Sequence, residues 1–462
     1  MNFTSPIFWI VLFFIYLIWI TIFCEKGKKE RFYLLGSSLL IYSIYFPFHA
    51  INIISVTYLT YKLSSLNGVN FRYIAIAINI LHLLFYKYNQ LFFPTSYLNV
   101  APRFEMLIPV GISFYTFQNL SYIFDLSRKQ SKCCKCFTDY LLYISFFPQL
   151  VAGPIVRYSY FIKQLNNRRK MNFKKFVVGC ERIIYGLFLK LVIANNLAFF
   201  VDQNWDKAYY IENGADWPLF LILAFSFQIF ADFSGYSLIA IGIALLFGIV
   251  LPQNFRAPYI SLSLSEFWQR WHRTLSRWIK DYLYIPFGGN LLKGWHMIFV
   301  LVVIMGLSGF WHGNTLSFGL WGILHGLALA FERFVVSKYK SRISVSCFKK
   351  YVSFIRFTYC FGVVAFTWIF FREQNTYFSL LFIRSLFFGE WSSSRLSEIT
   401  VNNPMFLYSL MIILVIHTFA FMRQRRSLKS LSIENRIYLC AFCIINCIYL
   451  YGSDASFIYF RF

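Results

Sequence analysis

Long apolar segments follow one another along this sequence, and they leave the chain few possible folds. Most of them are long enough to cross the hydrocarbon core of a bilayer as a helix. Within a bilayer the backbone polar groups must pair with one another, and a helix does this inside a single segment. The sequence therefore predicts an all-α, polytopic transmembrane helical bundle of about eleven to thirteen spans. The apolar segments are 7–24, 33–46, 48–62, 73–92, 104–125, 176–201, 218–250, 297–312, 316–336, 356–372, 405–422 and 436–452.

The composition agrees with a membrane bundle. Hydrophobic residues make up 58% of the chain and charged residues only 14%. A soluble domain of this length has too little interior to hide so much apolar surface. Two departures from simple spans are expected. Segments 33–46 and 48–62 are short and share a break at Pro47, and the run 138–162, which contains Pro148, is expected to be a re-entrant hairpin.

The chain carries a formal net charge of +25, and its cations lie mainly in short loops between the apolar segments. By the positive-inside rule these loops are cytoplasmic, whereas the acidic segment 202–216 is external. A basic inner face attracts anionic membrane lipids and a phosphate-bearing cytoplasmic substrate. Nucleic acid is not expected as a partner, because cations divided among short loops form no continuous binding face. The Ser-rich segment 390–404 is expected to be an external loop.

The ten cysteines do not predict a disulfide framework. Cys133, Cys134 and Cys136 lie in a predicted cytoplasmic loop, where thiols stay reduced. No second pair of ligands at matching spacing is near them, so no metal site is predicted. The N-terminus has neither a basic region ahead of its apolar run nor a small-residue cleavage site, so the first span is expected to be retained.

Aromatic and basic residues recur between residues 266 and 284 with the period of a helix. One expected face carries Trp268, Trp271, Leu275, Trp278 and Tyr282, and the opposite face carries Arg270, Arg273, Arg277 and Lys280. An apolar face opposite a cationic face is typical of a helix that lies in the membrane interface. His272 stands beside the aromatic face, so it is expected at the boundary between the apolar interior and water.

A second histidine, His312, stands at the end of an apolar run. Gly306 and Gly309 precede it and Gly313 follows it, so the backbone is expected to break and turn within the membrane. An imidazole at that depth is costly unless it is paired or takes part in chemistry. His325, in the next predicted helix, is either a structural residue or a further group that faces the same site.

Polar side chains interrupt several of the predicted spans. Gln118 and Asn119 follow an apolar run, and Asp232 lies within the segment 218–250. A carboxyl group in such a place must be protonated, paired or exposed to water. Two interpretations stay open. The groups form a buried polar network that fixes helix packing, or they face a hydrated chamber together with the two histidines.

The sequence lacks the common motifs of zinc proteases, serine hydrolases and phosphate-binding loops. What remains is a buried imidazole with no obvious side-chain nucleophile beside it. Such a group suits general-base catalysis, in which the histidine takes the proton of a substrate hydroxyl as the hydroxyl oxygen attacks an activated acyl carbon. The acyl donor would then be a thioester.

Several motifs resemble the membrane-bound O-acyltransferase family, and most closely its bacterial branch of alginate and peptidoglycan O-acetyltransferases, which also includes the teichoic-acid D-alanylation acyltransferase. They are GISFYTFQNLSYIFD (111–125), FFPQLVAGPIVR (146–157), ADFSGYS (231–237), PQNFRAPYISLSLSEFWQRWHRTLSRWIKDYLYIPFGGN (252–290) and GLSGFWHGNTLSFGLWGILHG (306–326). The resemblance implies a single membrane-embedded acyltransferase domain over residues 1–462. Its catalytic core would span about 104–337, followed by C-terminal helices at 338–462.

By this resemblance His312, in its FWHG setting, matches the catalytic histidine of the family, and His272, in its RWHRTLSRW setting, matches the second functional histidine. The family is similar in having a funnel open to the cytoplasm for the donor and an outlet on the far face. One position departs from the pattern. After ADFSGYS many relatives carry an acidic residue, whereas this chain has Leu238, which puts the role of that carboxylate in doubt here.

The C-terminal sequence FIYFRF, residues 457–462, also resembles this branch, in which an aromatic tail with a central tyrosine is suspected of carrying the acyl group. A phenol gives its proton to a histidine more easily than a sugar alcohol does, and an aryl ester is a more reactive acyl donor than an alkyl ester. Tyr459 is therefore a candidate acyl relay on the external side. The alternative is an interfacial aromatic anchor.

Together these features predict a membrane O-acetyltransferase of the bacterial inner membrane. It would move acetyl from cytoplasmic acetyl-CoA, without a permanently bound cofactor or metal, for O-acetylation of an extracytoplasmic polysaccharide, with peptidoglycan the first candidate and alginate the second. A separate periplasmic acetyltransferase is expected to act on the sugar. The predicted catalytic residues are His312, His272 and Tyr459. The predicted substrate-binding residues are Arg270, Arg273, Arg277, Trp268, Trp271, Asp232, Gln118, Asn119 and His325.

Two other classes of function stay open at this point. One is D-alanyl transfer to teichoic acid from a carrier-protein thioester. The other is a polytopic transporter or flippase with a polar site near the midplane of the membrane. Against transport, the two halves of the chain show no internal repeat, and the amphipathic aromatic segment has no role in alternating access.

Overall fold

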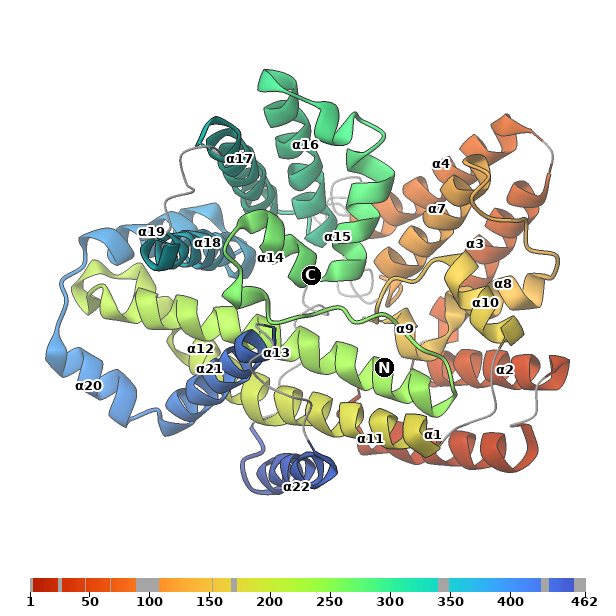
Figure 1. Cartoon of the computed structure of the whole chain (residues 1–462), viewed down its shortest axis with the longest axis horizontal. Helices are drawn as coiled ribbons and strands as arrows, with labels where there is room; N and C mark the ends of the chain where they lie inside the picture. The colour runs from red at the N-terminus through yellow and green to blue at the C-terminus, as the bar shows by residue number, and fades with distance from the viewer. Residues whose placement is uncertain are drawn as a thin grey trace, which may run out of the picture. The chain divides into compact units, whose positions relative to one another are not determined.

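The computed structural model describes residues 3–23, 27–45, 47–66, 68–88, 108–151, 153–167, 173–339, 349–424 and 432–452. Within these residues the regular structure is helical and no β-strand occurs, so the predicted all-α fold is confirmed (Figure 1). The chain divides into two compact units, Met1–Gly186 with Tyr236–Gln253, and Leu187–Gly235 with Asn254–Phe462. We refer to them as unit 1 and unit 2.

Unit 1 contains the N-terminal helices and the last turns of α13. Prolines set two of its helix starts, because a residue without a backbone N–H fits the first turn of a helix. Helix α3 begins at Pro47, at the predicted break, and α9 has Pro148 in its first turn. The predicted hairpin segment 138–162 is folded as α8, α9 and the start of α10, with irregular backbone between them. The helices are α1 (Pro6–Ile18), the π-helix η1 (Trp19–Phe23), α2 (Lys28–Tyr45), α3 (Pro47–Ser65), α4 (Val69–Lys87), α7 (Ile112–Ser127), α8 (Phe137–Ser145), α9 (Phe147–Leu150), α10 (Tyr158–Asn167) and most of α11 (Phe173–Phe188).

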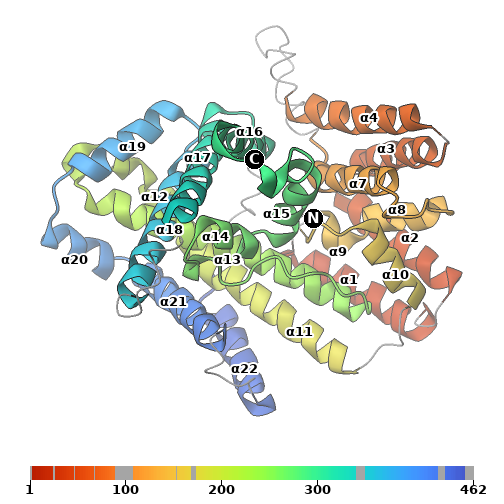
Figure 2. The same cartoon turned by 45° about the horizontal axis from the view of Figure 1, so that its top comes forward.

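Unit 2 contains the central and C-terminal helices, and α13 begins in it. Helix α12 packs beside α21, and α17 packs beside α16 and α18 (Figures 1 and 2). The elements are the π-helix η4 (Leu189–Ala194), α12 (Asn195–Asn204), η5 (Trp205–Tyr209), η6 (Ile211–Asn213), α13 (Asp216–Leu246), η7 (Pro258–Ile260), α14 (Leu264–Arg270), α15 (Arg273–Ile279), the π-helix η8 (Lys280–Tyr284), η9 (Gly289–Leu291), α16 (Gly294–His312), α17 (Leu316–Tyr339), α18 (Lys349–Arg372), α19 (Thr376–Phe388), α20 (Ser393–Val401), α21 (Pro404–Gln424) and α22 (Ile433–Tyr449).

The segment 390–404, expected to be a loop, contains helix α20, so that expectation is wrong. Tertiary contacts stabilise the helix. Asp216 Oδ2 accepts hydrogen bonds from the backbone N–H of Ser392 at 3.1 Å and from Arg395 Nε at 3.2 Å, and Ile399 is fully buried. Local composition cannot reveal such support, because Asp216 is distant in the sequence.

Seven helices in the described part of the chain are long and apolar enough to cross a membrane, and the number rises to eight if the bent pair α20 and α21 forms one span. The two members of that pair meet at 87°. Helices α2 and α3, predicted as short spans, are not among the seven. The predicted polytopic bundle is confirmed by these apolar helices, which are Pro6–Phe23, Val69–Lys87, Phe173–Tyr209, Asp216–Leu246, Gly294–His312, Leu316–Val335 and Tyr351–Arg372.

Helices α16 and α17 lie side by side in both ribbon views, and glycines allow them to approach very closely (Figures 1 and 2). A methyl group at Gly309 would lie 2.1 Å from the carbonyl oxygen of Phe318, and one at Gly322 would lie 2.1 Å from that of Met305. Small residues at such positions let membrane helices pack with their backbones almost in contact. This packing fixes the end of α16, where His312 lies.

The expected break of the backbone occurs at Gly313, directly after His312, and not at Gly306 or Gly309. Helix α16 continues through both glycines to His312, and the chain leaves helical geometry at Gly313. Gly309 is required by the contact with α17, whereas a methyl group at Gly306 would meet its nearest neighbouring atom at 3.6 Å. The glycine at position 309 is therefore explained by close helix packing and not by a turn of the backbone.

Candidate active site

The aromatic and basic segment 266–284 does not form the single helix that its spacing predicts. It is divided into α14, α15 and η8, and the first break falls at His272, whose backbone is left-handed (φ 39°, ψ 53°). Three hydrogen bonds to Asn254 accompany the break, one of them from the Thr274 N–H to Asn254 Oδ1 over 3.2 Å. The Arg273 N–H donates to the Asn254 carbonyl over 2.9 Å, and the Thr274 hydroxyl donates to Asn254 Oδ1 over 2.7 Å. The prediction of a continuous interfacial helix is therefore wrong. The hydrogen bonds to Asn254 compensate for the helical hydrogen bonds that are lost at the break.

The side chain of His272 lies in the interior of unit 2 and not at the expected boundary with water. It is 1% exposed, and its ring meets Phe233 edge-on with centroids 4.7 Å apart. The ring centroid of Phe255 lies 6.4 Å from that of His272. Burial lowers the pKa of His272 to about 3, so the imidazole is neutral at physiological pH. It cannot contribute a positive charge to an anion site.

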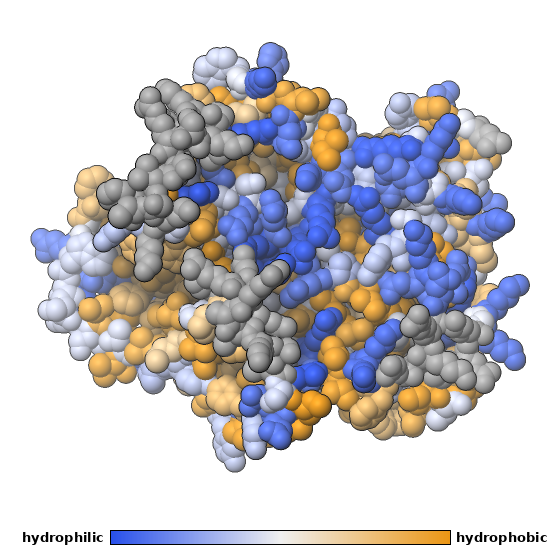
Figure 3. All heavy atoms as spheres, in the orientation of Figure 1, coloured by the Kyte–Doolittle hydropathy of each residue, from blue (hydrophilic) through white to orange (hydrophobic). Residues whose placement is uncertain are grey.

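A cavity of about 950 Å³ opens beside α14 and α15. Figure 3 shows hydrophilic residues gathered over these two helices. The predicted residues Trp268, Arg270, Arg273 and Arg277 all line this cavity. The charged lining consists of seven cations, Arg256, Arg270, Arg273, Arg277, Lys280, Arg333 and Arg356, and two carboxylates, Glu266 and Glu332. Such an excess of cations attracts an anionic ligand.

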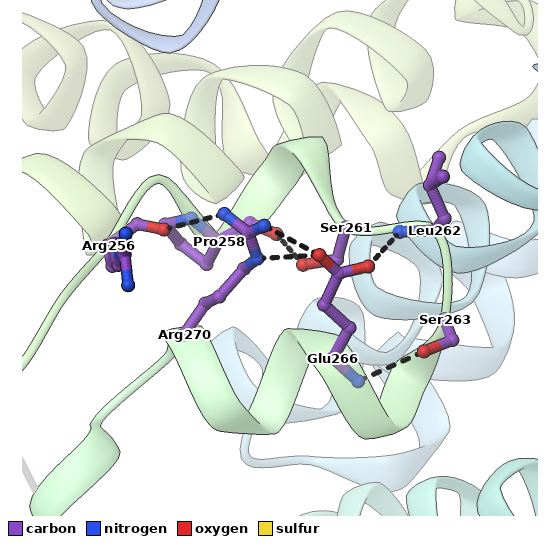
Figure 4. A network of polar contacts seen from close by, with 7 residues as sticks. All are labelled: Arg256, Pro258, Ser261, Leu262, Ser263, Glu266 and Arg270. Atoms are coloured by element: carbon purple, nitrogen blue, oxygen red, sulfur yellow. Dashed lines mark hydrogen bonds and ion pairs between the residues drawn. The ribbon is translucent and has the colours of Figure 1, made fainter. Parts of the chain in front are cut away.

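Arg270 is occupied by a contact within the protein (Figure 4). Its Nε and Nη2 atoms donate to Glu266 Oε1 over 2.9 and 2.6 Å, and its Nη1 atom donates to the carbonyl oxygen of Arg256 over 3.2 Å. Glu266 Oε2 in turn accepts from the Leu262 N–H, and the Glu266 N–H donates to Ser263 Oγ. Arg270 is itself 8% exposed. Its guanidinium therefore stabilises the start of α14.

Helical spacing did not single out three of the cavity cations, Arg256, Arg333 and Arg356. Arg256 is brought to α14 by its N–H, which donates to the Arg270 carbonyl over 3.0 Å. Arg333 lies on α17, and Arg356 lies on α18. These residues are far apart in the sequence, and their common signal was only a positive charge close to an apolar segment. Their convergence on one cavity follows from the packing of the helices.

His312 lies at the end of α16 among aromatic rings. It is 6% exposed, and its ring centroid lies 4.6 Å from Trp311, 5.2 Å from Trp321 and 5.0 Å from Phe371. Trp321 also contacts the cavity-lining Trp268, with ring centroids 5.9 Å apart. His312 itself is not among the residues that line the cavity. The ring of Trp321 therefore connects the cavity wall to the imidazole.

His325 belongs to the same aromatic group, and its hydrogen-bond partner is Thr367. Its Nε2 atom lies 2.9 Å from the Thr367 hydroxyl, which itself donates to the Val364 carbonyl. Since the hydroxyl proton is used there, the imidazole Nε2–H donates to the Thr367 oxygen. The ring packs against Trp268 and Trp321 at 5.1 and 5.0 Å. This geometry fits a residue that positions aromatic neighbours.

Asp232 forms a buried ion pair with a residue that sequence reasoning missed. Lys190 Nζ lies 2.8 Å from Asp232 Oδ1, and both side chains are almost completely buried. Lys190 lies in the π-helix η4, a geometry that often occurs at functional sites. The available signal was a lysine inside an apolar segment, a few residues before Asn195 and Asn196. A buried carboxyl group can be protonated, paired or exposed to water, and the structure shows that Asp232 is paired.

The remaining predicted residues lie elsewhere. Trp271 is buried in unit 2, where its ring stacks on Phe267 with centroids 5.6 Å apart. Gln118 and Asn119 are buried on α7 of unit 1. Asn119 Nδ2 donates to Asn79 Oδ1 over 3.0 Å, and its Oδ1 accepts from the Tyr140 hydroxyl. Asn119 therefore forms part of a polar network between helices. Tyr459 lies outside the described residues.

No group of three or more His, Cys, Asp or Glu side chains in the described ranges is arranged to hold a metal ion. Cys133, Cys134 and Cys136 form no disulfide within the described part of the chain, and the first two lie near the Tyr122 hydroxyl. The chemistry that the site offers is thus that of an imidazole enclosed by aromatic rings and a separate cationic cavity. Both belong to unit 2.

Comparison with known proteins identifies the family. Residues 135–371 match MBOAT, the membrane-bound O-acyltransferase family. A peptidoglycan O-acetyltransferase from Helicobacter pylori is 33% identical over 406 residues, which cover 81% of this chain and 74% of the relative. The chain belongs to the membrane-bound O-acyltransferase family. The matched region contains the cavity, His272, His312 and His325.

Membership in the membrane-bound O-acyltransferase family makes the chain a multi-pass membrane enzyme that transfers acyl groups, and the transporter alternative is not supported. A protein from Pseudomonas aeruginosa named "Probable alginate O-acetylase AlgI" is 36% identical over 296 residues, covering 64% of this chain and 54% of that protein. A teichoic acid D-alanyltransferase from Bacillus subtilis is 27% identical over 248 residues, covering 50% of this chain and 61% of that protein. The chain thus spans less than two thirds of the length of these two relatives.

Proposed function

We propose that this O-acyltransferase is an O-acetyltransferase of the bacterial inner membrane. It takes acetyl from cytoplasmic acetyl-CoA for O-acetylation of an extracytoplasmic polysaccharide. Peptidoglycan is the first candidate acceptor, since a relative that matches 406 residues is named for it, and alginate is the second. Relatives named for O-acetylation are 33–36% identical to the chain, whereas those named for D-alanyl transfer are 27–29% identical. This difference favours acetyl as the transferred group.

One arrangement carries the proposal, namely the aromatic connection between the cationic cavity and His312. Trp268 lines the cavity and contacts Trp321, and Trp321 contacts His312 at 5.2 Å between ring centroids. A donor whose phosphates are bound in the cavity would extend its thioester along these indole rings toward the imidazole. Aromatic walls exclude water, which strengthens electrostatic interactions within the site and protects the thioester from hydrolysis.

The proposed chemical step uses His312 as a general base. The imidazole takes the proton of an attacking hydroxyl while the hydroxyl oxygen forms a bond with the thioester carbonyl carbon. The carbon–sulfur bond then breaks, and the CoA thiolate leaves and takes the proton back from the imidazolium. The products are an ester and CoA. No metal ion or redox partner is needed for this balance.

The charge distribution within unit 2 supports entry at one end of the helices and exit at the other. Helix α16 runs toward His312, where Phe371 at the end of α18 contacts the imidazole. The next residue, Arg372, forms a 2.6 Å ion pair with Asp202 at the start of the acidic segment 202–216. The cationic cavity instead involves α15, η8 and the later turns of α17. By the positive-inside rule the cavity end faces the cytoplasm.

In this proposal the acyl group leaves through Tyr459 as a phenyl ester and is passed to a separate periplasmic acetyltransferase that acts on the polysaccharide. The residues before the tail are compatible with this role. The Gly452 N–H donates to the Leu191 carbonyl over 3.1 Å, and Asn196 Nδ2 donates to the Leu450 carbonyl over 3.1 Å. These two hydrogen bonds attach the end of α22 to η4 and α12. The acceptor in η4, Leu191, directly follows Lys190 in the sequence.

The other predicted residues have supporting roles in the proposal. His272 would fix the backbone that presents Arg273, since its ring is neutral and packed against Phe233. Asp232 would tune the interior of unit 2 through its pair with Lys190. Gln118 and Asn119 would stabilise helix packing. His325 would hold the indole rings of Trp268 and Trp321 in place.

The test is acetyl transfer by the purified full-length protein in lipid nanodiscs with radiolabelled acetyl-CoA. We expect CoA release and label on Tyr459, and both should fall by about 10²- to 10⁴-fold in His312→Gln. His417→Gln is the matched control, because His417 is also buried but its Nδ1 atom lies 2.9 Å from the Ile413 carbonyl, on α21. Full CoA release by a folded His312→Gln variant would exclude the proposed base. Activity with a D-alanyl carrier thioester in place of acetyl-CoA would assign D-alanyl transfer.

A further inference from the structure

Three arginines in the cavity wall differ from the others in having no partner among the described residues for their guanidinium groups. Arg270 is bound to Glu266, Arg333 donates to Asn290, and Arg356 Nε donates to the Leu262 carbonyl over 3.2 Å. The guanidinium groups of three others make no hydrogen bond or ion pair with the described residues. These are Arg256, Arg273 and Arg277, and we refer to them as the arginine triad.

The triad residues lie close enough to influence one another. Burial lowers the pKa of Arg273, and the charges of Arg277 and Arg256 lower it further. Arg273 and Arg277 are four residues apart on α15, a spacing at which like charges repel. Arg256 joins them because its N–H donates to the Arg270 carbonyl over 3.0 Å. The fold therefore concentrates three positive charges in one wall of the cavity.

The carboxylates of the cavity do not neutralise the triad, because each has another partner. Glu266 binds the guanidinium of Arg270. Glu332 Oε2 accepts the Leu264 N–H over 2.6 Å at the start of α14, and it also interacts with Arg356. Both carboxylates thus stabilise α14 and its surroundings. An anionic ligand would supply the charge that the triad lacks.

Backbone strain supports a ligand-binding role. Within the described ranges, the non-glycine residues with positive φ are Lys129, Ala257 and His272. Two of these three are adjacent to triad residues, since Ala257 (φ 42°) follows Arg256 and His272 (φ 39°) precedes Arg273. Left-handed backbone is costly for these residue types and concentrates at functional sites. Both strained residues are therefore next to arginines that line the cavity.

We propose that Arg256, Arg273 and Arg277 form a subsite for the phosphate groups of a phosphopantetheine thioester, whereas Arg270 is a structural residue. This inference rests on the proposed function, which supplies the thioester donor. Guanidinium groups bind phosphate oxygens through paired N–H donors, and several of them together suit a polyphosphate. The ligand chemistry is shared by free acyl-CoA and by a carrier protein that bears 4′-phosphopantetheine.

The test compares a donor with phosphates to one without them. Each of Arg256→Gln, Arg273→Gln and Arg277→Gln is assayed with acetyl-CoA and with S-acetylpantetheine. The KM for acetyl-CoA should rise about tenfold or more in each variant, since a charge-assisted hydrogen bond is lost. The kcat/KM for S-acetylpantetheine should stay at the wild-type value, because that donor carries no phosphate.

Two further variants serve as references. Arg384→Gln removes an arginine from α19, outside the cavity, and should leave both donors unaffected. Arg270→Gln should lower kcat/KM for both donors by the same factor, since it disturbs the start of α14. An equal loss for both donors in the triad variants would assign them a structural role and overturn the proposal. An unchanged KM for acetyl-CoA in all three variants would also overturn it.

Binding of radiolabelled CoA by equilibrium dialysis separates this inference from the proposed function. One outcome is that the wild-type protein binds CoA, that the triad variants bind CoA at least tenfold more weakly, and that no acetyl transfer occurs. In that case the subsite stands and the proposed function fails. If acetyl transfer occurs and the variants bind CoA as tightly as wild type, the proposed function stands and the subsite fails. A lower KM for acetyl-CoA than for S-acetyl-4′-phosphopantetheine identifies free CoA as the source, and equal values identify the carrier-borne group.

Discussion

The ammonium group of Lys190 lies 2.8 Å from the carboxylate of Asp232 inside unit 2, and the two side chains are only 2% and 4% exposed. Neither charge could be buried alone without a large desolvation penalty. The π-helix η4 carries the lysine, and α13 carries the aspartate. The pair therefore helps to fix the position of η4 relative to α13.

Removal of one member of this pair should destabilise the protein strongly. We expect Lys190→Met to cost about 3–5 kcal/mol, because it leaves an uncompensated carboxylate in an apolar interior. The double variant Lys190→Met with Asp232→Leu should recover much of that loss, as measured by the apparent Tm in detergent. Recovery of stability without recovery of acetyl transfer would show that the pair is needed for activity as well as for stability, and a double variant less stable than either single variant would contradict the pairing.

The contact between α16 and α17 predicts opposite behaviour for two nearby glycines. Gly309→Ala should destabilise the protein by about 1–3 kcal/mol, since the new methyl group would lie 2.1 Å from the Phe318 carbonyl oxygen. Gly306→Ala is the matched control, because its methyl group would have 3.6 Å to the nearest atom of Ile323. Apparent Tm values and acetyl transfer report the difference. Equal tolerance of both substitutions would show that α16 and α17 are not packed this closely.

The buried imidazole of His272 predicts a loss of stability in acid. Its pKa is lowered to about 3 in the folded protein, from an ordinary value of 6.5, so the unfolded chain binds the proton first as the pH falls. The stabilisation from the neutral ring is therefore complete above pH 6.5 and is lost progressively between pH 6.5 and about 3. From about pH 7.5 to about pH 5 the expected loss is roughly 2 kcal/mol.

His272→Asn removes this titration while it retains a residue type that tolerates left-handed backbone. The difference in apparent Tm between wild type and variant should narrow as the pH falls from 7.5 toward 5. Other histidines titrate in both proteins, so their effects cancel in the comparison. A difference that is constant over this range would mean that His272 does not carry the pH dependence.

The loop before α8 offers a test of membrane orientation. Cys136 is exposed, and a hydrogen bond from the Thr138 hydroxyl lowers its pKa, whereas burial raises that of Cys134. The thiolate is the reactive form, so Cys136 should react with a maleimide faster than Cys134. Because the basic loop is predicted to be cytoplasmic, an impermeant maleimide should label inside-out vesicles and spare intact spheroplasts. Cys136→Ser is the control, and labelling of spheroplasts at Cys136 would reverse the topology.

Local sequence patterns were sufficient for the spans because the length and composition of an apolar segment are properties of that segment. Helices α13, α16 and α17 lie close to the bounds predicted for them. The grouping of Arg273 and Arg277 was also predictable, since both belong to the cationic face of one short amphipathic stretch, whereas Trp268 was expected on the opposite face. The burial of His312 followed in the same way from its position at the end of an apolar run.

The tertiary structure decided which of these charges are available. Helical spacing places Arg270 and Arg273 on the same face, and both line the cavity, yet Arg270 is bound to Glu266 whereas Arg273 belongs to the arginine triad. Arg256 takes part because two backbone hydrogen bonds bind its segment to α14 and α15. The Arg256 N–H donates to the Arg270 carbonyl, and the Asn254 carbonyl accepts from the Arg273 N–H. Contacts of this kind join residues that are not neighbours in a helical repeat, so no periodic pattern encodes them.

The sequence alone thus determined a helical membrane enzyme with an imidazole in an apolar setting, because hydrophobic burial acts on each segment separately. Only the packed structure decided that Lys190 neutralises Asp232, that His272 interrupts a helix and that three arginines share one cavity wall. Each of these results depends on a hydrogen bond or ion pair between distant residues, whose free energy is gained only once the helices have packed.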